Sequence, residues 1–254
     1  MSLRIDLSGQ HILVTGATRG IGRAISEQLA EAGAKVAIHY FQSRDTAQHL
    51  AENIGHGAQS FQADLGKPVE VLQLFHNILD KFKRIDGVVN NAGIAIGASV
   101  EGDDIAFTDS WSRTMLVNLH ATGLICKKAI NHFQEIGGGR IVNIASRAAF
   151  RGDTSDYLAY AASKGGVVAL TRSIARAYGK QGIKAFTVAP GFTKTDMATD
   201  FIEKYGEEYV KNDIALTSLT KPADIAPTVA FLLSGLSDHA TGATIDINAG
   251  SYVH

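Results

Sequence analysis

Short apolar runs rich in β-branched residues alternate with longer helix-like stretches along most of this chain. This alternation predicts a parallel sheet with helices on both faces, because strands covered on both faces are nearly continuously apolar. The expected strands are His11–Thr15, Lys35–Tyr40, Ala58–Gln62, Gly87–Asn90, Arg140–Ile144, Lys184–Val188 and Thr244–Asn248. The expected helices are Gly20–Ala32, Arg44–Ile54, Pro68–Phe82, Ser110–Gln134, Ala159–Tyr178 and Pro222–Leu233.

The chain has 254 residues, four prolines and neither a repeat nor a Pro/Ser-rich linker. We therefore expect a single doubly wound α/β domain over residues 1–254, with about seven parallel strands. The segment 192–219 fits neither the strand nor the helix pattern. A long irregular insert in a compact domain is usually a lid or binding loop, so this segment is our candidate substrate lid.

Composition narrows the range of partners. Hydrophobic residues make up 45% of the chain, charged residues 19%, and the net charge is −1. These values predict a sizeable core and offer no basic excess for nucleic acid or an anionic membrane. No apolar run approaches 18 residues, so we expect no membrane span. The short N-terminus carries Arg4 and Asp6, and we expect it not to be a signal peptide. The single cysteine, Cys126, fits a reducing cytosol, and no histidine spacing suggests a metal site.

A glycine-rich loop separates the first expected strand from the first expected helix. It runs from Thr15 to Gly22, and its spacing is Gly-x-x-x-Gly-x-Gly. Glycines let a backbone approach a pyrophosphate at the positive end of a helix, so this loop predicts dinucleotide binding rather than an ordinary turn. The loop residues expected to contact the cofactor are Gly16, Thr18, Arg19, Gly20, Ile21 and Gly22.

The end of the second expected strand bears on the choice of cofactor. A carboxylate there would bind the ribose 2′-hydroxyl of NAD(H), but no acid follows Tyr40 until Asp45. Arg19 and Arg44 could instead pair with a 2′-phosphate, which favours NADP(H) with NAD(H) as the alternative. We expect Tyr40 and Arg44 to lie beside the cofactor; the arginines could equally be solvated surface charges.

Tyr160 and Lys164 stand four residues apart on an expected helix, so their side chains share one face. A phenol has a pKa near ~10, and an ammonium within about 4–6 Å lowers it by roughly 1–3 units. The pair therefore predicts a proton donor and acceptor useful near neutral pH. Tyr157 is the alternative candidate for this proton donor, but the residue four positions after it is Ala161 and not a lysine.

The order of the polar motifs along the chain is characteristic of one enzyme family. These motifs are the glycine loop, Asn90-Asn91-Ala92-Gly93, Asn118, Ser146, Tyr160 and Lys164. Over nearly its whole length the chain resembles the short-chain dehydrogenase/reductase family, a Rossmann-type fold. It is most similar to the 3-oxoacyl-acyl-carrier-protein reductase branch. The resemblance implies that Tyr160 is the acid/base, that Lys164 bonds the nicotinamide ribose, and that Ser146 bonds the substrate oxygen. Asn118 is implied to hold a water that links Lys164 to solvent.

The resemblance also implies the remaining contacts. The cofactor contacts are Asp64 and Leu65 at the adenine, Asn91, Ala92 and Gly93 on the central strand, and Pro190, Gly191 and Thr193 at the nicotinamide. The substrate contacts expected beside Ser146 and Tyr160 are Ala148, Phe150, Tyr157, Phe192 and Met197. A homotetramer built on the two long helices and the last strand is implied as well.

The expected activity is reversible hydride transfer between NADP(H) and a carbonyl carbon, with a 3-oxoacyl thioester on acyl carrier protein as the substrate. Four basic residues could dock such an acidic carrier or could equally be solvated helix faces: Lys127, Lys128, Arg172 and Arg176. The alternatives are an oxidoreductase for a sugar, polyol, steroid or other small ketone, a non-catalytic dinucleotide-binding protein, and a Rossmann-like methyltransferase. Ser146 precedes Tyr160 by 14 residues, about one more than the family pattern, which favours a bulged loop between them.

Overall fold

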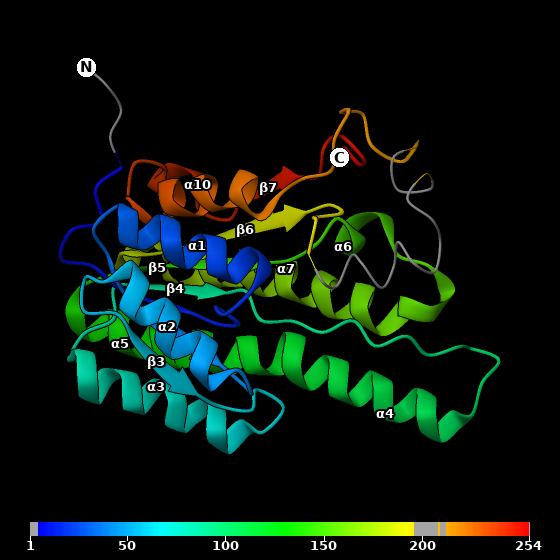
Figure 1. The fold of residues 1–254 in the computed structure, drawn as a ribbon, viewed down its shortest axis with the longest axis horizontal. Coiled ribbons are helices and arrows are strands. Elements are labelled where there is room, and N and C mark those ends of the chain that lie inside the picture. Colours follow the sequence, from blue (N-terminus) through cyan, green and yellow to red (C-terminus); the bar gives the residue numbers. More distant parts are fainter. Residues whose placement is uncertain (1–4, 196–207, 209–211, 254) are drawn as a thin grey trace.

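The computed structural model describes residues 5–195, 208 and 212–253. Its seven strands form one parallel sheet in the order β3-β2-β1-β4-β5-β6-β7 (Figure 1). The strands are β1 (His11–Val14), β2 (Lys35–Tyr40), β3 (Gln59–Gln62), β4 (Gly87–Asn90), β5 (Gly139–Ile144), β6 (Ile183–Pro190) and β7 (Thr244–Ile247). The chain winds outward from β1 in one direction and then outward from β4 in the other. The doubly wound prediction is confirmed.

Helices cover both faces of the sheet. One face carries α1 (Gly20–Glu31), α2 (Arg44–Ile54) and α10 (Pro222–Leu233), and the other carries α3 (Pro68–Phe82), α4 (Asp104–Met115), α5 (Ala121–Ile136) and α7 (Leu158–Tyr178). The two layers of core follow from the strand period: Ile12 and Val14 pack into the core under α1, whereas Leu13 packs into the core under α3 and α5.

The expected helix Ser110–Gln134 differs from the structure at its start and in its interior. The helical run begins at Asp104, because the Asp103 carboxylate accepts a hydrogen bond from the Ala106 N–H at 2.8 Å and caps the first turn. The run is interrupted by a π-helical segment, η1 (Leu116–His120), before α5 continues to Ile136. The residue pattern alone gave no sign of this π-helical turn.

The stretch between Ser146 and Tyr160 holds two short helical turns that the sequence did not predict. These are α6 (Ala148–Arg151) and the 3-10 turn η2 (Ser155–Tyr157). Gly152 ends α6 with a φ of 81°, in the left-handed region where glycine is unstrained. The 14-residue spacing is thus accommodated by a folded connection. Two further 3-10 turns are η3 (Gly179–Gln181) and η4 (Asp238–Ala240).

The described part of the candidate lid consists of its two ends, 192–195 and 212–219, and of Glu208. Thr193 forms a bridge with Thr220, and the Lys194 N–H donates to the Thr220 carbonyl at 2.9 Å. The Ala215 N–H donates to the carbonyl of Ala249 at 2.8 Å, which ties the far end of the segment to the C-terminal residues. Met197 and most of the expected lid fall outside the described residues. Within the part of the chain that the structure describes, no helix combines the length and apolarity that crossing a membrane requires.

We predict that Gly139→Ala destabilises the fold. A Cβ at Gly139 would overlap the ring of Phe133, which is 0% exposed beneath the first residue of β5. Overpacking of this kind costs about 1–3 kcal/mol, which thermal unfolding would record as a Tm lower by several degrees. Gly179→Ala is the matched control, because a Cβ there meets no atom within 4 Å. Equal melting temperatures for the two variants would contradict the prediction.

Candidate active site

The glycine loop lies between β1 and the first turn of α1. Gly16 and Gly20 have φ angles of 61° and 51°, which place both in the left-handed region. A Cβ at Gly22 would overlap the Gly16 carbonyl oxygen, so only glycine permits this turn. Arg19 at the N-cap of α1 makes no side-chain cap, and the first turn contains no acid. The amide groups of this turn therefore suit a pyrophosphate, and the loop fits a dinucleotide.

Hydrogen bonds join this loop to the loop after β4. The Asn91 side-chain amide donates to the carbonyls of Thr15 at 2.8 Å and Gly16 at 3.1 Å. In return, the Thr15 hydroxyl accepts from the N–H groups of Asn91 and Ala92 at 2.9 and 3.0 Å. Strands β1 and β4 are the neighbours where the winding reverses. The loops at the switch point, where such sheets bind ligands, are thus held together.

His39 supports the same loop, and no sequence signal identified it. Its Nδ1 accepts from the Gly16 N–H at 3.0 Å, and its Nε2 lies 3.1 Å from the Ala63 carbonyl oxygen. A carbonyl only accepts, so Nε2 carries the proton and the ring is neutral. The side chain is 2% exposed, and burial lowers the pKa of His39 to about 4.

Asp64, the expected adenine contact, is held by two donors. Its Oδ1 accepts from the Gly66 N–H at 2.8 Å and from Arg113 of α4 at 2.9 Å. Burial opposes ionisation, but these two bonds and the Arg113 charge hold the pKa of Asp64 below its ordinary value. Leu65 beside it is 8% exposed. Arg113 was not among the expected site residues.

Tyr40, the residue at the end of β2 that is expected beside the cofactor, has a largely buried side chain. It is 6% exposed and packs in the apolar core. Phe41, the next residue, lies beyond the end of β2 and is 45% exposed. Thr18 and Ile21 are partly buried, while Arg19 and Arg44 are both exposed near this edge of the sheet.

Ser146, Tyr160 and Lys164 converge beyond the carboxyl ends of β5 and β6. The Ser146 hydroxyl is hydrogen-bonded to the Tyr160 phenol, and its oxygen accepts from the Ala148 N–H at 3.1 Å. The Lys164 ammonium donates to the Ile144 carbonyl at 2.8 Å and lies 5.8 Å from the centroid of the Tyr160 ring. Lys164 is 4% exposed.

The expected lowering of the Tyr160 pKa is wrong for this structure. Burial raises the pKa of the Tyr160 phenol above its ordinary value, and the Asp153 charge adds to that rise while the bond from Ser146 opposes it. Burial also lowers the pKa of the Lys164 ammonium to about 8. The cost of burying a charge therefore exceeds the attraction that the spacing of the pair suggested.

Asn118 lies in η1 and joins three elements. Its Oδ1 accepts from the Ile94 N–H at 2.9 Å, and its amide donates to the Ile94 carbonyl at 2.9 Å and to Ser163 of α7 at 3.0 Å. Its main-chain carbonyl accepts from the Thr122 hydroxyl at 2.8 Å and keeps a second lone pair. A Cβ at Gly93 would lie 3.3 Å from Lys164 Nζ and 3.5 Å from Asn118 Oδ1. These three residues are neighbours.

The residues expected at the nicotinamide lie at the end of β6 and directly after it. Pro190 is the last residue of the strand, and Gly191 is so close to Asn248 that a Cβ would meet its Cα at 2.7 Å. Thr193 is 5% exposed, and its hydroxyl donates to the Gly191 carbonyl at 3.1 Å. The end of β6 therefore lies beside the end of β7.

The expected substrate residues are only partly brought together. A Cβ at Gly97 would lie 3.6 Å from the Tyr157 ring, so Tyr157 borders the loop after β4. Phe150 instead stacks on Tyr252 with ring centroids 6.4 Å apart, and Phe192 lies under the Arg147 guanidinium at 4.2 Å. Ala148 is 4% exposed, so its backbone rather than its side chain serves Ser146.

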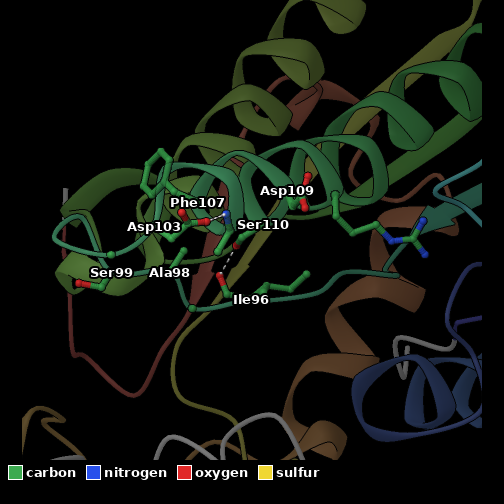
Figure 2. Close-up of a pocket in the computed structure, with 11 residues that line it drawn as sticks. Ile96, Ala98, Ser99, Asp103, Phe107, Asp109 and Ser110 are labelled. Atoms are coloured by element: carbon green, nitrogen blue, oxygen red, sulfur yellow. Dashed lines mark hydrogen bonds between the residues drawn. The ribbon is translucent and has the colours of Figure 1, made fainter.

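A separate pocket of about 600 Å³ lies between α4 and the loop after β4 (Figure 2). Ile96, Phe107, Ser110 and Arg113 are among its lining residues, and the Ser110 hydroxyl donates to the Ile96 carbonyl at 3.1 Å. Ser146, Tyr160 and Lys164 do not line it. This pocket is therefore distinct from the cluster of Ser146, Tyr160 and Lys164. The described residues include no group of three or more histidines, cysteines and acids placed to hold a metal ion.

A glycine loop suited to phosphate lies beside Ser146, Tyr160 and Lys164. This combination is typical of a dinucleotide-dependent oxidoreductase. Comparisons with known proteins agree. The family model described as "Enoyl-(Acyl carrier protein) reductase" matches residues 16–252. A 3-oxoacyl-(acyl-carrier-protein) reductase FabG from Staphylococcus aureus is 36% identical over 95% of this chain and 97% of its own length.

Two solved structures extend the likeness. A short-chain dehydrogenase from Burkholderia cenocepacia in complex with NADP has a TM-score of 0.89 and 33% identity, over 96% of this chain and 98% of its own. A 3-ketoacyl-(acyl-carrier-protein) reductase from Brucella melitensis complexed with NADH has a TM-score of 0.89 and 30% identity, over 98% of this chain and 100% of its own. The chain belongs to the short-chain dehydrogenase/reductase family of nicotinamide-dependent oxidoreductases.

We predict that His39 makes the protein less stable in acid. Its pKa is about 4 in the folded state against 6.5 for an ordinary histidine, so stability is complete above pH 6.5 and is lost as the pH falls toward 4. A gap of about 2.5 units corresponds to about 3 kcal/mol at most. His39→Asn keeps an acceptor for Gly16 but does not titrate. Denaturant midpoints between pH 7.5 and 4.5 should therefore fall more steeply for wild type, and parallel curves would refute the assignment.

Proposed function

We propose that this protein is an NADP(H)-dependent carbonyl reductase and alcohol dehydrogenase that reduces a 3-oxoacyl thioester carried on acyl carrier protein. The observation that carries the chemistry is the hydrogen bond between Ser146 and Tyr160 beside the buried Lys164 ammonium. The substrate class is proposed from the likeness to the Staphylococcus aureus reductase. We also propose that it acts in a reducing cytosol, because its single cysteine, Cys126, is a buried thiol.

When bound, the nicotinamide supplies or accepts the hydride at the carbonyl carbon. Ser146 donates a hydrogen bond to the substrate oxygen and stabilises the charge that develops there. Tyr160 then gives its proton to that oxygen, which completes the alcohol. The raised pKa of Tyr160 keeps the phenol protonated at neutral pH, and this favours the reductive direction. The Lys164 ammonium stabilises the tyrosinate left behind, until a water held at the Asn118 carbonyl returns the proton.

The preference for NADP(H) rests on the charges at the adenosine end. Arg19 in the loop and Arg44 at the start of α2 are both exposed there. The first acid after β2 is Asp45, which lies within the first turn of α2. A guanidinium pair suits a 2′-phosphate, and the missing carboxylate removes the usual partner of a free 2′-hydroxyl. NAD(H) remains the alternative cofactor.

We propose a homotetramer in which copies meet on α4, α5, α7 and β7. The apolar side chains on α4 and at the start of α7 support this: Ile105 is 72% exposed, Leu158 42% and Trp111 36%. Trp111 stacks on Phe107 with ring centroids 5.9 Å apart, which holds the patch in one shape.

We propose that the carrier protein contacts four basic residues: the exposed Lys127, Arg172 and Arg176 and the half-buried Lys128.

Tyr160→Phe should lower turnover by roughly 10²- to 10⁴-fold, because it removes the proton that completes reduction. NADPH affinity, measured by the cofactor's fluorescence, should stay close to that of wild type. Tyr157→Phe is the matched control: it removes a hydroxyl from the same region but lacks the lysine neighbour. Near-normal turnover in Tyr160→Phe would exclude its role as the acid.

A substrate and cofactor panel tests the assignment as a whole. We expect acetoacetyl-CoA with NADPH to give the highest kcat/KM among thioesters, sugars and cyclic ketones. NADPH should exceed NADH by roughly tenfold, the effect of one charge-assisted bond to the 2′-phosphate. An Arg19→Ala/Arg44→Ala variant should lose that preference while retaining activity with NADH. A sugar or cyclic ketone as the best substrate would move the protein to the alternative class, and no turnover at all would make it a binding protein.

A further inference from the structure

Arg147 directly follows Ser146 and carries a buried charge that the proposed chemistry does not use. Its side chain is 8% exposed. Its main-chain N–H donates to the Pro190 carbonyl at 3.0 Å, which ties the loop after β5 to the end of β6. The residue after the proposed substrate-binding serine is therefore fixed at its backbone and enclosed at its side chain.

Two partners enclose the guanidinium. Its carbon lies over the Phe192 ring at 4.2 Å from the centroid, and Nη1 pairs with Asp213 Oδ2 at 2.5 Å. Phe192 follows β6, and Asp213 lies 21 residues further along the chain. Arg147 thus links the Ser146 loop to two separate points on the substrate side of the sheet.

The contact geometry requires an arginine. A guanidinium is planar, so one face can stack on an aromatic ring while its edge pairs with a carboxylate, and a lysine ammonium offers no such plane. Burial lowers the pKa of Arg147, and the bond to Asp213 opposes that effect. A buried cation that loses its paired carboxylate is strongly unfavourable, so Arg147, Phe192 and Asp213 hold one another in place.

Arg151 is the natural comparison. Its Nη1 bonds both oxygens of Asp213, at 2.8 and 3.1 Å, so it shares the carboxylate with Arg147. Its side chain is 32% exposed, and solvent screens the pair. Arg151 lies at the end of α6, five residues after Ser146. A substitution there perturbs the same ion pair without touching the residue next to Ser146.

We propose that Arg147 is a positioning residue of the active site: by pairing with Asp213 and stacking on Phe192, it holds the Ser146 hydroxyl at the place where a ketone oxygen must bind. The inference rests on the proposed carbonyl reduction. It predicts that loss of Arg147 impairs the use of ketone far more than the binding of cofactor, since the glycine loop lies on other elements.

The test compares wild type with Arg147→Met, Asp213→Asn, Arg151→Met and the Arg147→Met/Asp213→Asn double variant. The assay uses acetoacetyl-CoA, or the panel ketone that wild type reduces fastest, with NADPH. Arg147→Met should lose roughly 10- to 100-fold in kcat/KM for the ketone, the range expected when a reacting group is displaced. Its NADPH dissociation constant, read by fluorescence, should stay within about twofold. No glycine-loop contact changes, and the bond to Pro190 at the expected nicotinamide end comes from the Arg147 main chain, which the substitution retains.

The remaining variants separate positioning from general damage. Asp213→Asn should lose at least about fivefold in kcat/KM, and the double variant should be no worse than Arg147→Met, since the two residues act as one unit. Arg151→Met should lose less than about threefold because its charge is screened. Arg147→Lys should recover only part of the loss, since it keeps the charge but not the stacking plane.

Several outcomes would overturn the proposal. These are additive losses in the double variant, a loss of NADPH affinity that matches the loss of kcat/KM, or equal effects of Arg147→Met and Arg151→Met. If Arg147→Met does not fold, Asp213→Asn decides: activity within about twofold of wild type rejects the role. A wild-type protein without ketone turnover would reject the proposed function and this inference together, whereas an active wild type with an equally active Arg147→Met rejects the inference alone.

Discussion

The hydrogen bonds between the loops after β1 and β4 are the constraint on which the remaining structure depends. Two neighbouring parallel strands send their chains to opposite faces at this point, and a crevice opens between them. Asn91 and Thr15 hold its two sides together through four bonds. The shape that excludes a side chain from Gly22 follows from these bonds, since the Asn91 amide also lies against that position. The sheet order thus creates the crevice, and a few short polar side chains define its form.

Burial explains the electrostatics of the interior. It lowers the pKa of His39 to about 4 and of Lys164 to about 8, and it raises the pKa of Tyr160 and, to about 12, that of Cys126. In each case the neutral form is favoured because charge is costly away from water. For Tyr160 this keeps the phenol a proton donor. For His39 it keeps the acceptor that the glycine loop needs. A single physical cause serves both the proposed chemistry and the support of the cofactor loop.

The fold was predictable because its information is local. Each of the patterns used for the prediction lies within a short stretch of sequence: the alternating apolar runs, the glycine loop and the Tyr160–Lys164 spacing. These local patterns were enough to predict the seven strands and most of the long helices. His39, Arg113 and Arg147 were missed because their partners lie 23, 49 and 66 residues away. The burial of the Tyr40 side chain was not predicted, because the face that a strand residue turns to the core depends on the pairing register of the sheet. The direction of the Tyr160 pKa shift also needed the structure, since spacing reveals a neighbour but not the loss of solvent.

The π-helical turn at Asn118 has a consequence for how this chain can change. Such a turn places five residues where a regular helix has about four, so it is equivalent to one inserted residue. If these five residues adopted a regular α-helix instead, α4 would turn by about 100° relative to α5, the rotation of one residue. Arg113 would then leave Asp64, and Trp111 would turn to another side. The irregular turn therefore sets the phase between Arg113 and Asn118, and deletion of one residue between Leu116 and His120 would restore a regular helix while keeping that phase.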